Sequence, residues 1–124
     1  MPKTTSQRSP PRIIVGIDPG IAITGYAFIR ELQGHLTLLS CDVIRTPSKM
    51  PLEDRFLSIY KQMDTLLTVH HPTDAAMETL FFGKNKKTAM QVAHARGVLL
   101  LTLSQHDVPI AEYGQSEVSS YRLW

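Results

Sequence analysis

The sequence has little cysteine and no long apolar run, and each shortage excludes a class of protein. Cys41 is the only cysteine among 124 residues, which excludes an internal disulfide framework and a zinc site built from several cysteines. No apolar run reaches the roughly 20 residues that cross a bilayer. The N-terminus also lacks the apolar segment of a secretory signal. We therefore expect a cytoplasmic protein with no membrane partner.

Neither sign of charge dominates, because the net charge is +2 with a pI near 8.8. Such a weakly basic chain permits a nucleic-acid partner without requiring one. The basic residues are unevenly spread: the first twelve residues contain no acid, and three lysines occur within four positions. These are Lys84, Lys86 and Lys87. We predict a disordered basic tail over residues 1–11 and one domain over residues 12–124.

Dense apolar segments in the first third of the chain predict three strands. Residues 13–17 (IIVGI) are short and rich in β-branched side chains, and Asp18-Pro19-Gly20 follows as a turn. Residues 22–30 and 35–45 continue the pattern, with a turn at Gln33-Gly34 between them. Short links of this kind favour an antiparallel meander.

Two helical patterns then alternate with two short strands. Apolar residues at spacings of three and four predict a helix that ends before Pro72 and a second helix over residues 85–104. The first apolar face consists of Leu52, Phe56, Ile59, Met63 and Leu66. The second face consists of Ala89, Val92, Ala93, Arg96 and Leu100. With strands at 74–77 and 108–113, the order β-β-β-α-β-α-β predicts an α/β domain with parallel crossovers.

Two carboxylates follow apolar strands in this arrangement. Asp18 comes directly after the first strand and Glu78 directly after the fourth. Binding sites in open α/β sheets form outside the carboxyl ends of the strands, so parallel neighbours would bring these two acids together. Close carboxylates repel each other, and a divalent cation such as Mg²⁺ or Mn²⁺ removes the conflict. Taken singly, Asp18 is equally well explained as a turn former, and Glu78 is somewhat better explained as an exposed charge at a strand end.

Two longer motifs carry a resemblance to a known family. The segments GIDPGIAITGYAFI and METLFFGKNKKTAMQVAHARGVLL resemble the RuvC family of Holliday-junction resolvases, which have the RNase H-like fold. The resemblance extends from about residue 13 to residue 118. The first motif alone is moderately specific, because sugar kinases and Hsp70-type ATPases of the same superfold begin similarly. The match becomes specific with Glu78, Phe81, Asn85 and the sequence ARGV at residues 95–98.

The resemblance implies a metal-dependent endonuclease that resolves four-way DNA junctions in recombination and repair. It implies that Asp18 and Glu78 are catalytic metal ligands for Mg²⁺, with Mn²⁺ as the alternative ion. It implies that Phe81 stacks on a base at the crossover and that a basic segment contacts DNA. That segment comprises Lys84, Asn85, Lys86 and Lys87. The implied partners are a second copy of the chain, held largely by the helix over residues 85–104, and a branch-migration helicase complex.

The chain departs from the family pattern after its fifth strand. The family places further acidic ligands on a later helix with the pattern D/H-x-x-D-A, whereas Asp107, Glu112 and Glu117 are the only acids after Glu78. Ser119 stands where the family has a lysine. We therefore expect a truncated or frame-shifted RNase H-like domain that lacks its last helices and is catalytically impaired.

Two other functions stay open from the sequence. One is a non-catalytic module that dimerises or grips branched DNA. The other is an ATPase or kinase of the same superfold, in which the turn after Asp18 would cradle phosphates. Ile21 follows Gly20 where phosphate turns of that class usually carry a Gly-Thr or Gly-Ser pair, which ranks this alternative last.

Overall fold

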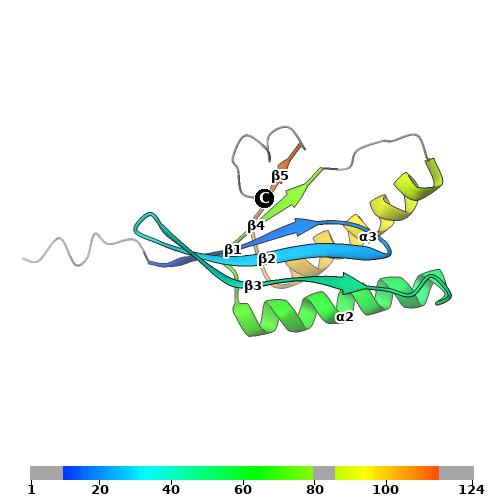
Figure 1. The fold of residues 1–124 in the computed structure, drawn as a ribbon, viewed down its shortest axis with the longest axis horizontal. Helices are drawn as coiled ribbons and strands as arrows, with labels where there is room; N and C mark the ends of the chain where they lie inside the picture. Colours follow the sequence, from blue (N-terminus) through cyan, green and yellow to red (C-terminus); the bar gives the residue numbers. More distant parts are fainter. Residues whose placement is uncertain (1–9, 80–85, 115–124) are drawn as a thin grey trace, which may run out of the picture.

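A mixed five-stranded sheet forms the centre of the protein in the computed structural model, which describes residues 10–79 and 86–114. The strands are β1 (Arg12–Asp18), β2 (Ile23–Leu32), β3 (His35–Arg45), β4 (Asp74–Glu78) and β5 (Ile110–Tyr113), and the helices are α2 (Leu52–His70) and α3 (Lys86–Gln105). The spatial order is β3-β2-β1-β4-β5 (Figure 1). The first three strands pair antiparallel, and β4 and β5 add in parallel through the two helices. The predicted RNase H-like order is confirmed.

Both helices pack on one face of the sheet, where alternate strand residues enter a common core. Val15 and Ile17 of β1, Phe28 of β2 and Met77 of β4 are at most 1% exposed. They join core residues of the two helices, which are Ile59, Met63, Leu67, Ala95, Leu99 and Leu103. The intervening strand residues, Asp18 and Glu78 among them, therefore project on the other face.

The predicted helix faces are partly wrong, because the buried stripe of each helix lies slightly to one side. In α2 the buried residues are Arg55, Ile59, Met63 and Leu67, whereas Leu52 is 37% exposed. In α3 they are Ala89, Ala95, Leu99, Thr102 and Leu103, whereas the predicted Leu100 is partly buried and packs against the same core. Each helix contacts both the sheet and the other helix, so its apolar surface is wider than one narrow stripe.

The helix ends explain the remaining differences in boundaries. Asp107 has a φ of 56° and takes the left-handed position that glycine usually fills after a helix. The amide of Val108 then donates to the carbonyl of Leu103 at 3.1 Å, which ties it to the helix end rather than to a strand. Strand β5 therefore begins at Ile110 and not at residue 108. Neither described helix is long and apolar enough to cross a membrane.

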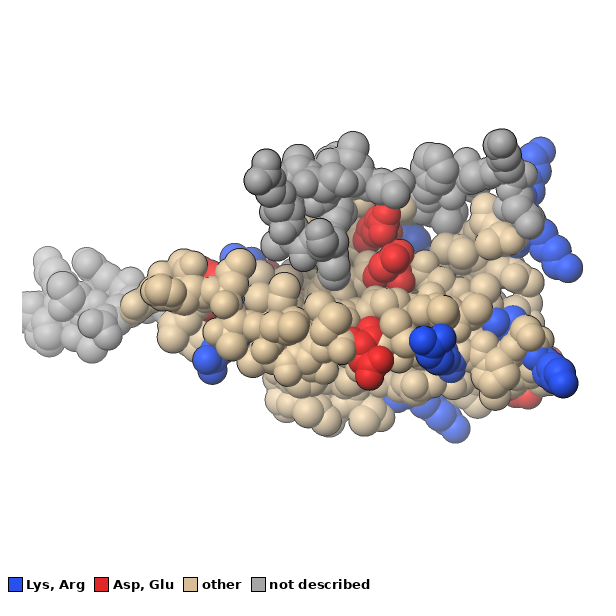
Figure 2. Space-filling model, in the orientation of Figure 1, with Lys and Arg blue, Asp and Glu red and all other residues tan. Residues whose placement is uncertain are grey.

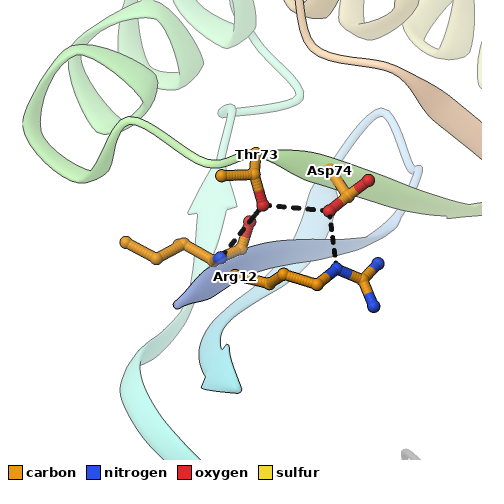
Figure 3. A network of polar contacts seen from close by, with 4 residues as sticks. Arg12, Thr73 and Asp74 are labelled. Carbon is orange, nitrogen blue, oxygen red and sulfur yellow. Dashed lines mark hydrogen bonds and ion pairs between the residues drawn. The ribbon is translucent and has the colours of Figure 1, made fainter. Parts of the chain in front are cut away.

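A polar network fastens the start of β1 to the start of β4 (Figure 3). The Nε of Arg12 lies 3.1 Å from Oδ2 of Asp74, and the Thr73 hydroxyl lies 2.9 Å from the same oxygen. The Ile13 amide donates to that hydroxyl at 3.1 Å. These contacts fix the register of the two strands at one end, which decides which residues meet at the other end.

Candidate metal and nucleic-acid site

Asp18 and Glu78 lie side by side at the carboxyl ends of two parallel neighbouring strands. The ladder of β1 and β4 pairs Ile17 with Met77, and the two acids are the next residue on each strand. Asp18 is exposed and Glu78 is half-buried. The expected convergence of the two carboxylates is confirmed.

The electrostatics of the pair follow from this proximity. Burial raises the pKa of Glu78 above its ordinary value of 4.5, and the charge of Asp18 and a hydrogen bond to it raise that pKa further. The raised pKa means that ionising Glu78 beside the charged Asp18 costs free energy. A proton or a cation between the carboxylates removes this cost, so the arrangement fits a divalent ion with oxygen ligands.

The turn after Asp18 is held by a hydroxyl group of the next strand. The hydroxyl of Thr24 on β2 donates to the carbonyl of Gly20 at 2.8 Å, and the Gly20 amide donates to the same hydroxyl oxygen at 3.4 Å. Across the ladder, Gly25 pairs with Asp18, and a Cβ there would lie 3.8 Å from the Asp18 Cβ. The absence of a side chain at Gly25 leaves the flank of the aspartate open.

Strand β5 supports Glu78 from the other side. Glu78 pairs with Tyr113, and the Thr79 amide donates to the Tyr113 carbonyl at 2.7 Å. Glu112 lies in register with Met77 and therefore faces the helices, where it forms an ion pair with Arg96 of α3. Arg96 is therefore engaged in a contact within the protomer, and Glu112 does not join the carboxylate pair.

The pair supplies only part of a metal site. Within residues 10–79 and 86–114, no group of three or more His, Cys, Asp or Glu side chains could hold a metal ion. Two carboxylates fit one divalent ion as partial ligands, whereas Mg²⁺ requires a nearly octahedral set of six oxygens. We therefore expect weak Mg²⁺ binding by these two residues.

Only some of the predicted DNA-binding residues lie in the part of the chain that the structure describes. Lys86 and Lys87 begin α3 and are exposed. Figure 2 shows basic side chains toward the end of the molecule where α3 begins, beyond acidic side chains near the middle of the face. Phe81, Lys84 and Asn85 lie outside the described residues.

Sequence reasoning missed the contribution of Thr46 and Arg55. Arg55 is 8% exposed, and its Nε donates to the Thr46 hydroxyl at 3.0 Å. One signal for Arg55 was present, because it stands four residues before Ile59 and eight before Met63, on the buried stripe. Nothing comparable in the sequence marks Thr46.

We expect Glu78→Gln to stabilise the fold at neutral pH. The native pKa of Glu78 is raised, so between the unfolded and native values the folded chain binds more protons and stability falls as pH rises. The amide removes the repulsion and should raise the free energy of unfolding at pH 7 by about 0.5–1 kcal/mol, which is the usual size for partly exposed charges. Below pH 4.5 the advantage should vanish, as thermal unfolding across pH would show.

Glu112→Gln is the matched control for that measurement, because Glu112 stands one residue before Tyr113, the partner of Glu78 on β5. It breaks the ion pair with Arg96, so it should lower stability at pH 7 rather than raise it. Added Mg²⁺ should stabilise the wild type and leave Glu78→Gln unchanged. A loss of stability in Glu78→Gln at neutral pH would contradict the close carboxylate pair.

Comparison with known proteins places this geometry in a family. The family model described as crossover junction endodeoxyribonuclease RuvC matches residues 14–121. Crossover junction endodeoxyribonuclease RuvC of Roseiflexus sp. (strain RS-1) is 43% identical over 104 residues, which cover 84% of this chain and 62% of that protein. The chain thus spans less than two thirds of that relative.

Solved structures agree with the sequence match. A Thermus thermophilus RuvC in complex with Holliday junction substrate superposes with a TM-score of 0.80 at 27% identity, covering 88% of this chain and 68% of that one. The yeast mitochondrial Holliday junction resolvase shares the fold at a TM-score of 0.62 and 16% identity, covering 94% of this chain and 59% of that one. With the family model matched over nearly the whole described domain, the chain belongs to the RuvC family of crossover junction endodeoxyribonucleases.

Proposed function

We propose that the protein acts on four-way DNA junctions as part of a metal-dependent resolving endonuclease. The observation that carries this proposal is the meeting of Asp18 and Glu78 at the carboxyl ends of β1 and β4, in a chain of the RuvC family. The solved relative that is bound to a Holliday junction supports the choice of substrate.

In this proposal the two carboxylates hold a divalent ion, Mg²⁺ or Mn²⁺, beside the phosphodiester. Such an ion activates water and stabilises the leaving oxygen of the phosphate. The exposed Asp18 and the half-buried Glu78 would both hold such an ion, and the exposure of Asp18 would leave it accessible to DNA. Gly25 leaves room beside Asp18 for the approaching backbone of the nucleic acid.

The DNA contacts are proposed for the segment that leads into α3. Lys86 and Lys87 place positive charge at a helix N-terminus, where the helix dipole itself does not favour cations. A bound phosphate would offset that cost. Lys84 and Asn85 extend the same segment, and Phe81 is proposed to stack on an unpaired base at the crossover.

The test is binding of a labelled four-way junction against a plain duplex of the same length, in Mg²⁺ at several salt concentrations. We expect preference for the junction, a steep loss of affinity with salt, and a weaker preference in Phe81→Ala, because stacking is worth about 1–3 kcal/mol per base. Leu57→Ala, an exposed apolar position on α2, serves as the control and should bind like the wild type. Equal affinity for junction and duplex would overturn the proposal.

A non-catalytic DNA-binding or dimerisation module is the second candidate, favoured by the incomplete ligand set among the described residues. It predicts the same junction preference without dependence on Asp18 or Glu78. An ATPase or kinase of the superfold would instead require tight ATP binding at the turn after Asp18. ATP titration of the wild type distinguishes this last alternative.

A homodimer built on α3 is also part of the proposal. Met90 is 61% exposed and Leu101 is 57% exposed, on a helix whose opposite side is already buried in the core. Gly97 lies between them, and a Cβ there would meet no atom within 4 Å. A twofold pair of subunits would match the twofold symmetry of a four-way junction.

Gly97→Arg tests that surface, because the protomer has room for the side chain and a helix-to-helix contact does not. We expect the variant to sediment as a monomer at concentrations at which the wild type is dimeric, with the same circular dichroism. Dimers of unchanged affinity would exclude this face of α3.

We further propose a cytoplasmic location, consistent with the exposed, unpaired Cys41, and a branch-migration helicase complex as the partner.

A further inference from the structure

The three residues between Pro19 and β2 have all of their carbonyl groups held by threonines. The Gly20 carbonyl accepts from the Thr24 hydroxyl at 2.8 Å, the Ile21 carbonyl from the Thr46 hydroxyl, and the Ala22 carbonyl from the Thr46 amide at 3.0 Å. Thr24 is fully buried and Thr46 is 4% exposed. The turn that presents Asp18 is therefore bonded residue by residue to β2 and to the end of β3.

Arg55 decides which way the Thr46 hydroxyl points. Its Nε donates to that hydroxyl at 3.0 Å, and its Nη2 donates to the Thr46 carbonyl at 3.2 Å. A guanidinium can only donate, so the hydroxyl must accept from it and give its single hydrogen to the Ile21 carbonyl. The fork of Arg55 thus fixes both the position and the polarity of the bond that holds the turn.

The setting of Arg55 is unusual for a purely structural arginine. It is 8% exposed, yet no ion pair of the described residues includes it, and its two bonds go to one threonine. A buried cation without a carboxylate partner is costly, and an apolar residue at this site on α2 would avoid the cost. Holding a strand-end turn at a fixed place is a benefit that an apolar residue does not supply.

We propose that Thr46 and Arg55 are positioning residues for Asp18, which set its carboxylate against Glu78 for divalent-ion binding. This inference rests on the proposed function, because Asp18 is a metal ligand only in that proposal. It assigns no contact with metal or DNA to Thr46 or Arg55. It predicts that breaking the link weakens metal binding beyond any effect on folding. Residues that orient ligands from behind typically change metal affinity by about 10–100-fold.

The experiment is Mn²⁺ titration of the full chain, followed by the electron paramagnetic resonance signal of the free ion, with thermal unfolding of each variant. Thr46→Val keeps the shape and removes the hydroxyl, and we expect its Mn²⁺ affinity to fall about tenfold. Thr46→Ser restores the hydroxyl and should restore the affinity. Thr102→Val is the matched control, since Thr102 is fully buried and donates to the Val98 carbonyl at 2.7 Å, far from the turn in the chain.

The outcomes separate this inference from the function on which it rests. If Glu78→Gln abolishes Mn²⁺ binding but Thr46→Val binds like Thr102→Val, the positioning role is wrong and the metal site stands. If the wild type binds no Mn²⁺, or Glu78→Gln binds as well as the wild type, both the proposed site and this inference are overturned. Arg55→Lys keeps the charge without the fork and should resemble Thr46→Val.

Discussion

Gly20→Ala should be the most damaging single substitution in the described part of the turn. A Cβ at this position would lie 2.0 Å from the carbonyl oxygen of Ile23 and 3.1 Å from its carbonyl carbon. These are backbone atoms at the start of β2, so they cannot turn aside as the tip of a side chain can. The turn must move, which breaks the bonds between Gly20 and Thr24. We expect a loss of about 2–3 kcal/mol in the free energy of unfolding, as for overpacked sites.

The same movement should displace Asp18, which is two residues earlier, and therefore weaken Mn²⁺ binding. Chemical denaturation and metal titration measure the two effects separately. Measured at a concentration at which the chain is monomeric, Gly97→Ala is the control of opposite sign, because its Cβ meets no atom within 4 Å and alanine favours a helix by about 0.5–1 kcal/mol. Wild-type stability in Gly20→Ala would show that the turn adopts another conformation.

Much of the fold could be predicted from the sequence because the local apolar patterns of strands and helices match the surfaces that are buried in the folded domain. Residues 13–17 of β1 are apolar because β1 is the central strand of the sheet, and its place beside β4 follows from the crossover helix. The end of α3 was less predictable, because the left-handed position after the helix is occupied by Asp107. Glycine, the residue that usually marks such an end in a sequence, is absent there. Boundaries of this kind depend on a single residue's conformation, which composition does not reveal.

The candidate site shows the same division between local and distant information. Asp18 and Glu78 were predictable because each stands at the carboxyl end of its own apolar segment, and parallel pairing of the two strands then brings them together. The support behind Asp18 was not, since Thr46 and Arg55 belong to a strand end and a helix that meet only in the folded protein. An arginine on a helical stripe is ordinarily a surface residue, so its burial becomes evident only with its hydroxyl and carbonyl partners in place.

The 124-residue chain, tested as it is, should bind a four-way junction without cutting it. Two divalent ions carry four positive charges, whereas Asp18 and Glu78 supply two negative charges and the phosphate adds one. Further fixed oxygens are needed to hold the second ion and to orient the attacking water. Among the described residues no third acidic side chain joins the pair, and Glu112 is engaged by Arg96 on the other face of the sheet.

The measurement is incubation of a labelled four-way junction with the purified chain in Mg²⁺ and in Mn²⁺, beside the Asp18→Asn variant. We expect the two proteins to give the same background, because one weakly held ion does not complete a two-ion site. Bound junction on a native gel must accompany that result, since it shows that the protein is folded and engaged. Symmetric nicks that disappear in Asp18→Asn would contradict the prediction.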